Sequence, residues 1–272
     1  MCTRRTSGFG SNTSMRIVTR RPSSLGVSRK TEAAVSRLNL MSPMAENNLL
    51  LLGKDYPTYG VFDSFPVGER SAAAISVGSD VDSPSQRFKE DPLVPNEDAL
   101  SVVDTDDWAG FAVADAHYGP ESSHMLVERL HRIWLQIRPT DLQHFAQMFE
   151  FLRNGEPQLT RSETTLLAVA YDRASRTGFG LSIGDSSFVV VGQNQPPLTV
   201  NQRDMRFANA DDRHSLARPR GFEFRAEPGD LLLTFTDGID ECHYRTPETS
   251  IQPADIAAVA SGAGYDPLAT VT

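Results

Sequence analysis

The sequence of 272 residues has few cysteines and no long apolar run. Two cysteines, Cys2 and Cys242, cannot build a disulfide framework or a four-ligand zinc site. The longest aliphatic stretch near the start, Leu49–Leu52, is far shorter than the roughly 18–20 apolar residues of a membrane helix. We therefore expect no membrane partner, and the scarcity of cysteine favours a reducing, cytoplasmic setting.

Basic side chains are also scarce over most of the chain. Residues 1–45 carry eight basic and one acidic side chain, a net charge of +7, whereas the remainder carries 18 basic and 34 acidic side chains, a net charge of −16. An acidic body repels nucleic-acid phosphate, so we expect no nucleic-acid partner. Such a body is compatible with divalent cations, although acidity alone does not show that they bind.

The first 45 residues differ in composition from the rest. They are rich in Arg, Ser and Thr and show no sustained period, which predicts a disordered segment. An over-extended start site is a related interpretation, because Met15, Met41 and Met44 each follow a suitable leader. A targeting peptide or a basic arm for an acidic partner is the functional alternative. Residues 46–272 are predicted to form one domain.

Apolar patterns predict the elements of this domain. A short strand is expected at 72–77 and a buried strand pair at 100–103 and 110–114, and helical spacing is present at 121–137 and 142–152. Further strands are expected at Thr164–Tyr171, Gly178–Ile183, Phe188–Val191, Gly221–Ala226 and Leu231–Thr236, followed by a helix after Pro253. This order predicts an α+β domain with antiparallel sheets, with residues 192–220 as a flap or insertion.

Acidic residues stand where several of these apolar strands begin or end. They are Glu97, Asp98, Asp115, Asp185 and Asp237. A carboxylate at the end of a buried strand is costly unless it is paired or binds a metal, and no lysine or arginine stands beside these residues. Oxygen ligands favour hard cations such as Mg²⁺ or Mn²⁺.

Each acidic position also has an interpretation without a metal. Asp237-Gly238 is typical of a turn after a strand, and Gly184-Asp185-Ser186 of a hairpin turn. The segment Asp115–His117 fits a solvated loop, and Glu97 and Asp98 fit a turn cap. What favours the metal interpretation is that all these motifs occur together and in a particular order.

In that order, the motifs resemble those of the metal-dependent protein serine/threonine phosphatases, protein phosphatase type 2C. The resemblance runs from about Asn96 to Thr272. It rests on Asn96-Glu97-Asp98-Ala99, Phe111-Ala112-Val113-Ala114-Asp115-Ala116-His117, Thr164-Thr165-Leu166-Leu167, Gly184-Asp185-Ser186, and Gly229-Asp230-Leu231-Leu232-Leu233 before Thr236-Asp237-Gly238. It implies an α+β fold, a four-layer α-β-β-α sandwich of two antiparallel sheets flanked by helices.

The resemblance also implies a site for two Mg²⁺ or Mn²⁺ ions. By residue matching, Asp115 would bridge both ions, the backbone carbonyl of Ala116 would bind one of them, and Asp237 would ligate the second. Glu97 and Asp98 would hold metal-bound waters. The implied activity is hydrolysis of phosphoserine and phosphothreonine in proteins by a metal-activated water, without a phosphoenzyme intermediate.

Two further residues receive roles from the same matching. Asp185, together with Asp237, would support a weaker third ion. His117 would act as general acid on the leaving serine or threonine oxygen, and a solvated histidine beside the site is the alternative. The implied partner is a phosphorylated protein, a kinase or its target; the sequence does not fix the oligomeric state.

The chain departs from the family pattern in three places. Ala116 stands where the family usually has glycine, which leaves a carbonyl ligand possible if its φ is negative. Leu93 stands where many members have a phosphate-binding arginine, and Arg87 or Lys89 is a candidate substitute. No Asp-Asn pair follows Asp237, so the family's final strand is missing from this sequence.

The third departure has structural and functional consequences. A sheet without its final strand exposes an edge or leaves a groove in the core. The later aspartates, Asp255 and Asp266, fit helix starts better than metal ligands. The departures motivate an alternative function, a catalytically impaired pseudophosphatase that acts as a regulatory or phosphoprotein-binding module.

Overall fold

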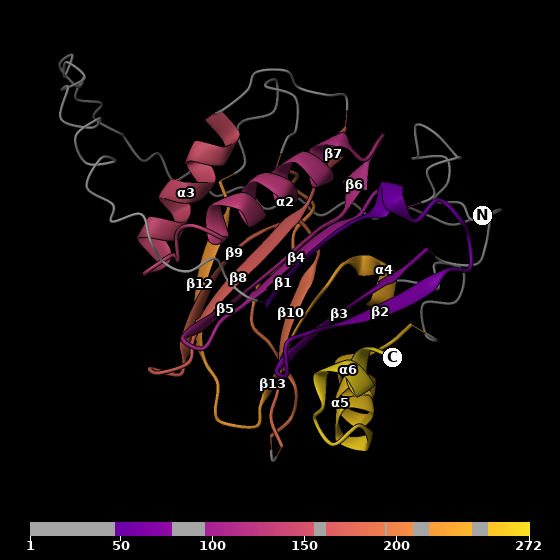
Figure 1. Cartoon of the computed structure of the whole chain (residues 1–272), viewed down its shortest axis with the longest axis vertical. Coiled ribbons are helices and arrows are strands. Elements are labelled where there is room, and N and C mark those ends of the chain that lie inside the picture. Colours follow the sequence, from indigo (N-terminus) through magenta and orange to yellow (C-terminus); the bar gives the residue numbers. More distant parts are fainter. Residues whose placement is uncertain (1–46, 78–95, 155–161, 194, 209–217, 241–249) are drawn as a thin grey trace, which may run out of the picture. The chain divides into compact units, whose positions relative to one another are not determined.

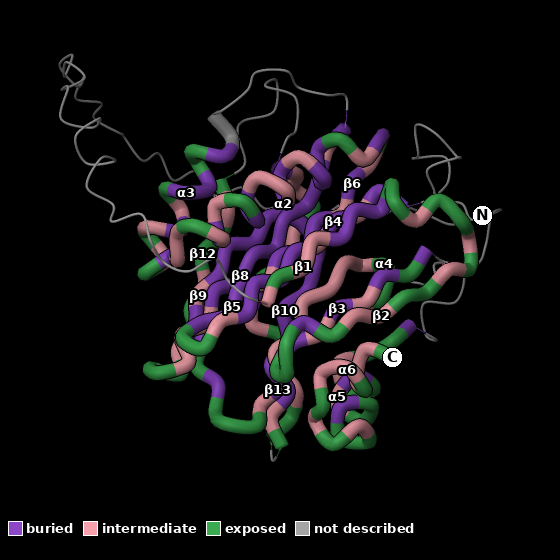
Figure 2. The backbone as a smooth tube through the Cα atoms, viewed as in Figure 1, coloured by how far each residue is buried: buried purple, intermediate pink, exposed green. Residues whose placement is uncertain are grey.

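A computed structural model describes residues 47–77, 96–154, 162–193, 195–208, 218–240 and 250–272. Its largest element is an antiparallel six-stranded sheet (Figure 1). The strands, in spatial order, are β1 (Asn47–Leu52), β4 (Ala99–Asp104), β5 (Trp108–Ala114), β8 (Leu166–Asp172), β9 (Thr177–Ile183) and β12 (Arg220–Arg225). Strands β5 and β8 are continuous apolar runs, and the sheet buries them on both faces (Figure 2).

Two helices cover one face of this sheet. They are α2 (Glu121–Trp134) and α3 (Leu142–Asn154), and their apolar stripes pack against the strands. The Asp141 carboxylate accepts a hydrogen bond from the backbone N–H of His144 at 2.8 Å and so caps α3. α2 ends at Trp134, three residues before the predicted residue 137.

The other face carries two separate groups of strands. One group is a three-stranded sheet of β11 (Leu198–Thr199), β10 (Ser187–Val191) and β13 (Leu231–Phe235), in that order. The second is the hairpin of β2 (Phe62–Val67) and β3 (Ser71–Ser76). Phe188 of β10 packs between the sheets, whereas Ile75 of β3 packs over β1 and β4. The predicted α+β domain is confirmed to the extent that the structure combines helices with a large antiparallel sheet.

The C-terminal helices are α5 (Pro253–Gly262) and α6 (Pro267–Val271). Ile256 of α5 packs against β10 and β13, and α6 packs against β2 and β3. Asp255 forms a capping box with Gln252, and the Asp266 carboxylate accepts from the N–H of Ala269. Both aspartates are therefore helix-start residues, as expected from the sequence.

Short elements surround the acidic strand ends. They are the 3₁₀ helix η1 (Gly53–Asp55), β6 (Ala116–His117), β7 (Glu163–Thr164) and α4 (Asp237–Asp240). The predicted strand at Thr164–Tyr171 is divided at Thr165 into β7, which pairs with β6, and β8, which pairs with β5. This division turns the chain towards the residues that follow β5.

Other sequence predictions differ from the structure or fall outside its described residues. The hairpin interpretation of Gly184–Ser186 is wrong, because β9 and β10 belong to different sheets. Strands β1 and β2 were not predicted. Residues 1–45 and the loop expected at 80–95 lie outside the described residues. None of the described helices is long and apolar enough to cross a membrane.

Candidate functional site

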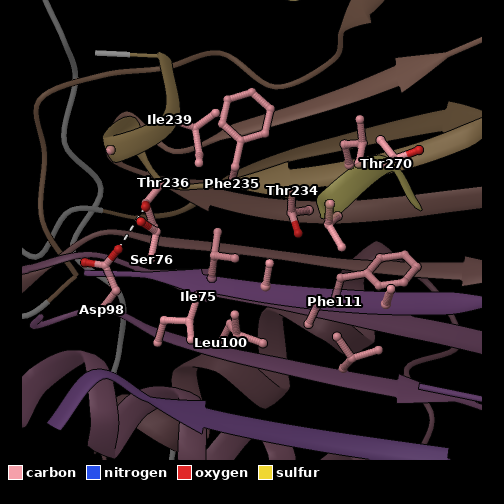
Figure 3. A pocket seen from close by; sticks show the side chains of 18 of the residues that line it. Ile75, Ser76, Asp98, Leu100, Phe111, Thr234, Phe235, Thr236, Ile239 and Thr270 are labelled. Atoms are coloured by element: carbon pink, nitrogen blue, oxygen red, sulfur yellow. Dashed lines mark hydrogen bonds between the residues drawn. The ribbon is translucent and has the colours of Figure 1, made fainter. Parts of the chain in front are cut away.

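The residues that the sequence analysis assigned to a metal and catalytic site all line one groove of about 1910 Å³. They are Glu97, Asp98, Asp115, Ala116, His117, Asp185 and Asp237. The groove brings them together because β4 begins where β5 ends: Ala99 is the register partner of Ala114. β13 also ends there, since the Thr236 hydroxyl donates to the Asp98 carboxylate at 2.9 Å (Figure 3).

At this end of the groove the carboxyl group of Asp115 contacts two other carboxyl groups. The side chain of Asp115 lies within hydrogen-bonding reach of Asp98 and Asp237. Desolvation raises the pKa of Asp115 well above its usual range, and the negative charges of Asp98 and Asp237 raise this pKa further. Such a group of carboxylates is stabilised by protons or by bound cations.

The oxygen atoms of these residues are of the chemical type that binds a hard divalent cation. Their arrangement fits such a cation only in part. Carboxylate and carbonyl oxygens are the ligands that Mg²⁺ and Mn²⁺ prefer. Across the described residues, however, no group of three or more His, Cys, Asp or Glu side chains is arranged to hold a metal ion. The contact of Asp115 with two other carboxyl groups is therefore the observation that favours a cation here.

Two threonines hold the backbone of Asp115. The Asp115 N–H donates to the Thr165 hydroxyl at 3.0 Å, and the Thr164 hydroxyl donates to the Asp115 carbonyl at 2.9 Å. The Thr165 N–H donates to the same carbonyl at 2.8 Å. The break between β7 and β8 thus fixes Asp115, a role that the sequence motif Thr164-Thr165 did not reveal.

Gly184 places the Asp185 turn against Thr165. Gly184 has a φ of +101°, and a Cβ atom there would lie 2.5 Å from the Thr165 Cγ2 atom. Any side chain at this position would be strained and would displace Thr165. The Ser186 and Thr165 hydroxyls are 3.1 Å apart, so the turn that carries Asp185 also supports the residue that fixes Asp115.

A second close backbone approach fixes the segment Asn96–Asp98. The N–H of Gly53, which follows β1, donates to the Asp98 carbonyl at 2.8 Å. A Cβ atom at Gly53 would lie 2.4 Å from the Asn96 carbonyl oxygen, so this contact requires glycine. Glu97 is 2% exposed, and its Oε1 accepts from the Gly119 N–H at 3.0 Å. The predicted role of Glu97 towards a metal-bound water stays a prediction.

His117 projects from the short strand β6 beside the acidic group. Its Nδ1 lies 3.6 Å from the Glu163 Oε1, and its ring packs edge-on against Phe207, with 5.2 Å between centroids. Glu163 is the register partner of His117 in the β6–β7 ladder. Sequence reasoning missed both Glu163 and Phe207, since their contact with His117 depends on strand pairing and on the fold of residues 195–208.

Of the departures from the family pattern, the structure describes the one at Ala116 but not the one at Leu93. Ala116 lies in the extended strand β6 and does not have a positive φ, so the condition for a carbonyl ligand at this position is met. Leu93 and its candidate substitutes, Arg87 and Lys89, lie outside the described residues.

The raised pKa of Asp115 predicts how stability depends on pH in the metal-free protein. Between the ordinary aspartate pKa and the raised one, the folded state holds more protons than the unfolded state, so the free energy of unfolding falls as pH rises. The Asp115→Asn variant should lack this fall and should be more stable than the wild type at neutral pH. Urea denaturation in the presence of EDTA at several pH values measures this; parallel curves for both proteins would contradict the prediction.

Comparisons with known proteins identify the fold. No protein-family model matches the sequence, and no curated protein matches it. The serine/threonine phosphatase of S. agalactiae is 16% identical, with a TM-score of 0.50 over 65% of this chain and 86% of that chain. The serine/threonine phosphatase PstP/Ppp of Mycobacterium tuberculosis is 16% identical, with a TM-score of 0.49 over 64% and 82%. RsbX in complex with magnesium is 13% identical, with a TM-score of 0.43 over 59% and 82%. The first of these structures shows that the chain shares the fold of a serine/threonine phosphatase.

Proposed function

We propose that this protein is a Mg²⁺- or Mn²⁺-dependent phosphatase that hydrolyses phosphoserine and phosphothreonine in proteins. The observation that carries the proposal is the contact of Asp115 with Asp98 and Asp237, which come from positions far apart in the sequence and meet in one groove. The shared fold supports it. The described packing also supports the finer arrangement of four α-β-β-α layers, and the low cysteine content supports a cytoplasmic location.

The residues of the groove would have different roles in binding cations. Asp115, the carbonyl of Ala116 and Asp237 would hold the first two ions, and Glu97 and Asp98 would orient the surrounding water. Asp185 lines the same groove and would support a third. Divalent cations at such a site lower the pKa of water and stabilise the charge of the transferring phosphoryl group.

His117 and Glu163 assist departure of the leaving group. During hydrolysis the oxygen of water forms a bond to phosphorus, and the bond from phosphorus to the serine or threonine oxygen breaks. His117 lines the groove and donates a proton to that leaving oxygen. Glu163, 3.6 Å from the His117 Nδ1, holds the ring so that its Nε2 is available for this transfer.

The proposal is tested by phosphate release from a phosphothreonine peptide. The full chain is incubated with millimolar Mn²⁺ or with EDTA, and inorganic phosphate is measured over time. We expect turnover with Mn²⁺ and none with EDTA. Absence of turnover with both Mn²⁺ and Mg²⁺ at substrate concentrations up to millimolar contradicts the enzymatic function.

The alternative is a regulatory module that binds phosphoproteins without hydrolysing them. The observation that favours it is that, of the side chains the structure describes, no three are arranged as ligands of one ion. Calorimetry separates the two functions: an enzyme should bind Mn²⁺ in a stoichiometric pair, whereas the binding module should retain a phosphopeptide without tight metal binding.

Thr236→Val should weaken Mn²⁺ binding by about 10-fold, the low end of the 10- to 100-fold range for groups around metal ligands, because Thr236 orients Asp98, which would hold metal-bound water. The Thr236 hydroxyl donates to the Asp98 carboxylate at 2.9 Å and connects the end of β13 with the start of β4. Calorimetric titration of the variant measures the effect. Thr199→Val on the exposed strand β11 is the matched control and should bind Mn²⁺ as the wild type does. Equal affinity of the Thr236 variant and the control would contradict this role.

A further inference from the structure

The segment of residues 201–208 is fixed to the candidate site at its start and in its middle. Asn201 is 6% exposed, and its Oδ1 accepts from the Phe188 N–H at 2.7 Å. In the middle of the segment, the Asp204 N–H donates to the Gly184 carbonyl at 2.8 Å, and the Gly184 N–H donates to the Asp204 Oδ1 at 3.2 Å. These bonds hold the segment against β10 and against the turn that precedes it.

The end of this segment is fixed to β7. Ala208 is buried, and its N–H donates to the Thr164 carbonyl at 2.6 Å. Glu163, which precedes Thr164 in β7, is the register partner of His117 in β6. Phe207, which precedes Ala208, is therefore placed beside His117 by the same short strand that carries Glu163.

The side chains of Phe207, Tyr118 and Glu163 contact the His117 ring. The Phe207 ring packs edge-on, with 5.2 Å between centroids and an interplanar angle of 64°. The Tyr118 ring lies edge-on at 6.2 Å, and the Glu163 Oε1 lies 3.6 Å from the His117 Nδ1. Tyr118 and Glu163 line the groove, whereas Phe207 is not among the described residues that line it. Phe207 thus contacts the ring without occupying the space in which a substrate would lie.

The His117 ring needs such a contact to keep one orientation. The His117 side chain is 37% exposed on a strand of two residues, and the torsion angle that rotates a histidine ring has a broad energy minimum. The 3.6 Å between Glu163 and Nδ1 is longer than a usual hydrogen bond, so this contact leaves the ring free to rotate to some extent. A displacement of about 1 Å in a reacting group can reduce a rate by about 100-fold. The packing of Phe207 therefore bears on catalysis.

We propose that Phe207 is a positioning residue: by packing against His117, it keeps the imidazole oriented for proton transfer to the leaving serine or threonine oxygen. In that step the bond from phosphorus to the leaving oxygen breaks, its electron pair stays on the oxygen, and the oxygen takes the proton from the His117 Nε2. This kinetic consequence rests on the proposed phosphatase function. The restraint on the ring does not, because it is a property of the metal-free protein.

Two substrates with different leaving groups test the kinetic consequence in Phe207→Ala. The threonine oxygen of a phosphopeptide is a poor leaving group and needs a proton, whereas the nitrophenolate of p-nitrophenyl phosphate leaves without one. General acid catalysis contributes about 10²–10⁴-fold, so a poorly oriented acid should lower kcat for the phosphopeptide by about tenfold or more. The kcat for p-nitrophenyl phosphate should change by less than about twofold.

Matched variants separate positioning from a general structural effect. Phe207→Tyr keeps the aromatic ring and should retain most of the kcat for the phosphopeptide. Phe151→Ala removes a phenylalanine that is 72% exposed on α3 and should act on both substrates as the wild type does. In the His117→Gln background, Phe207→Ala should cause no further loss, because residues that act through one group are not additive. Thermal melting verifies that each variant folds.

Nuclear magnetic resonance of the metal-free protein measures the restraint without catalysis. In the wild type, nuclear Overhauser effects should connect the His117 and Phe207 rings. Carbon relaxation should show that the His117 ring is as rigid as that of His131, which is 7% exposed on α2. In Phe207→Ala the His117 ring should become more mobile, whereas the His131 ring should not. The His117 signals are assigned with His117→Gln.

Several results would overturn the proposal. These are an equal loss of kcat for both substrates, a full further loss in the His117→Gln background, no contact between the two rings in the wild type, or unchanged mobility of the His117 ring in Phe207→Ala. The wild-type measurements and Phe207→Tyr decide the matter if Phe207→Ala does not fold. If the wild type releases no phosphate from either substrate, the phosphatase function fails, and the resonance measurements still decide whether Phe207 positions His117.

Discussion

Replacing Asp115 with asparagine should abolish metal-dependent phosphate release. Asp115 is the carboxylate that contacts both Asp98 and Asp237, and its backbone is held by Thr164 and Thr165. Asparagine keeps the size of the side chain and removes the negative charge on which cation binding depends. Because bound metal ions lower the barrier for phosphoryl transfer by several kcal/mol, the expected loss in kcat/KM is about 10³-fold or more.

The measurement is hydrolysis of an aryl phosphate with Mn²⁺, so that recognition of a protein substrate does not enter. Asp106→Asn is the matched control: Asp106 is fully exposed and pairs with Arg70 in the turn between β4 and β5, at the other end of β4 from Asp98. The control should keep wild-type activity. If the Asp115 variant hydrolyses the substrate at the rate of the control, the proposed site is wrong.

Replacing Phe188 with alanine should strongly reduce the free energy of unfolding. Phe188 of β10 is 0% exposed and packs with Val113, Leu167 and Phe224 of the six-stranded sheet. Removing a buried phenylalanine side chain leaves a cavity and costs about 3–5 kcal/mol. This is a large fraction of the roughly 5–15 kcal/mol by which domains are stable. Urea denaturation measures the loss directly.

The same substitution should also weaken Mn²⁺ binding. β10 pairs with β13, which leads into Asp237, whereas Asp115 follows β5 of the other sheet. A weaker contact between the sheets therefore makes the distance between Asp115 and Asp237 less well fixed. Phe151→Ala is the matched control, because Phe151 is 72% exposed on α3 and its removal should change stability by under about 0.5 kcal/mol. Equal stability of both variants would mean that the sheets are not held together as described.

The sequence alone predicted most strands that carry the candidate site, and it predicted its acids. Runs such as Leu166–Ala170 and Phe188–Val191 are apolar on both faces, so burial could be predicted from local composition. Because acidic residues directly adjoin such runs in the sequence, they lie at the ends of the strands. The order of the motifs then led us to expect Asp98, Asp115 and Asp237 at one site, and Asp115 lies within hydrogen-bonding reach of the other two.

The strands that the sequence did not predict lack such local patterns. Asn47–Leu52 is four leucines after two asparagines, without alternation, and Phe62–Val67 contains a proline. Proline is placed in strands only at edges or bulges, so its presence argued against a strand there. These segments are strands because β4 and β3 pair with them. Pairing between distant segments is not encoded in a local period.

The sequence by itself determined which residues are acidic, which runs are buried, and that the acids stand at strand ends. Only the tertiary structure decided that Glu163 stands opposite His117, that Gly53 holds Asp98, and that Thr165 holds the backbone of Asp115. The physical reason is that register and sheet membership depend on the mutual packing of segments tens of residues apart, whereas burial and charge are properties of each residue and its immediate neighbours.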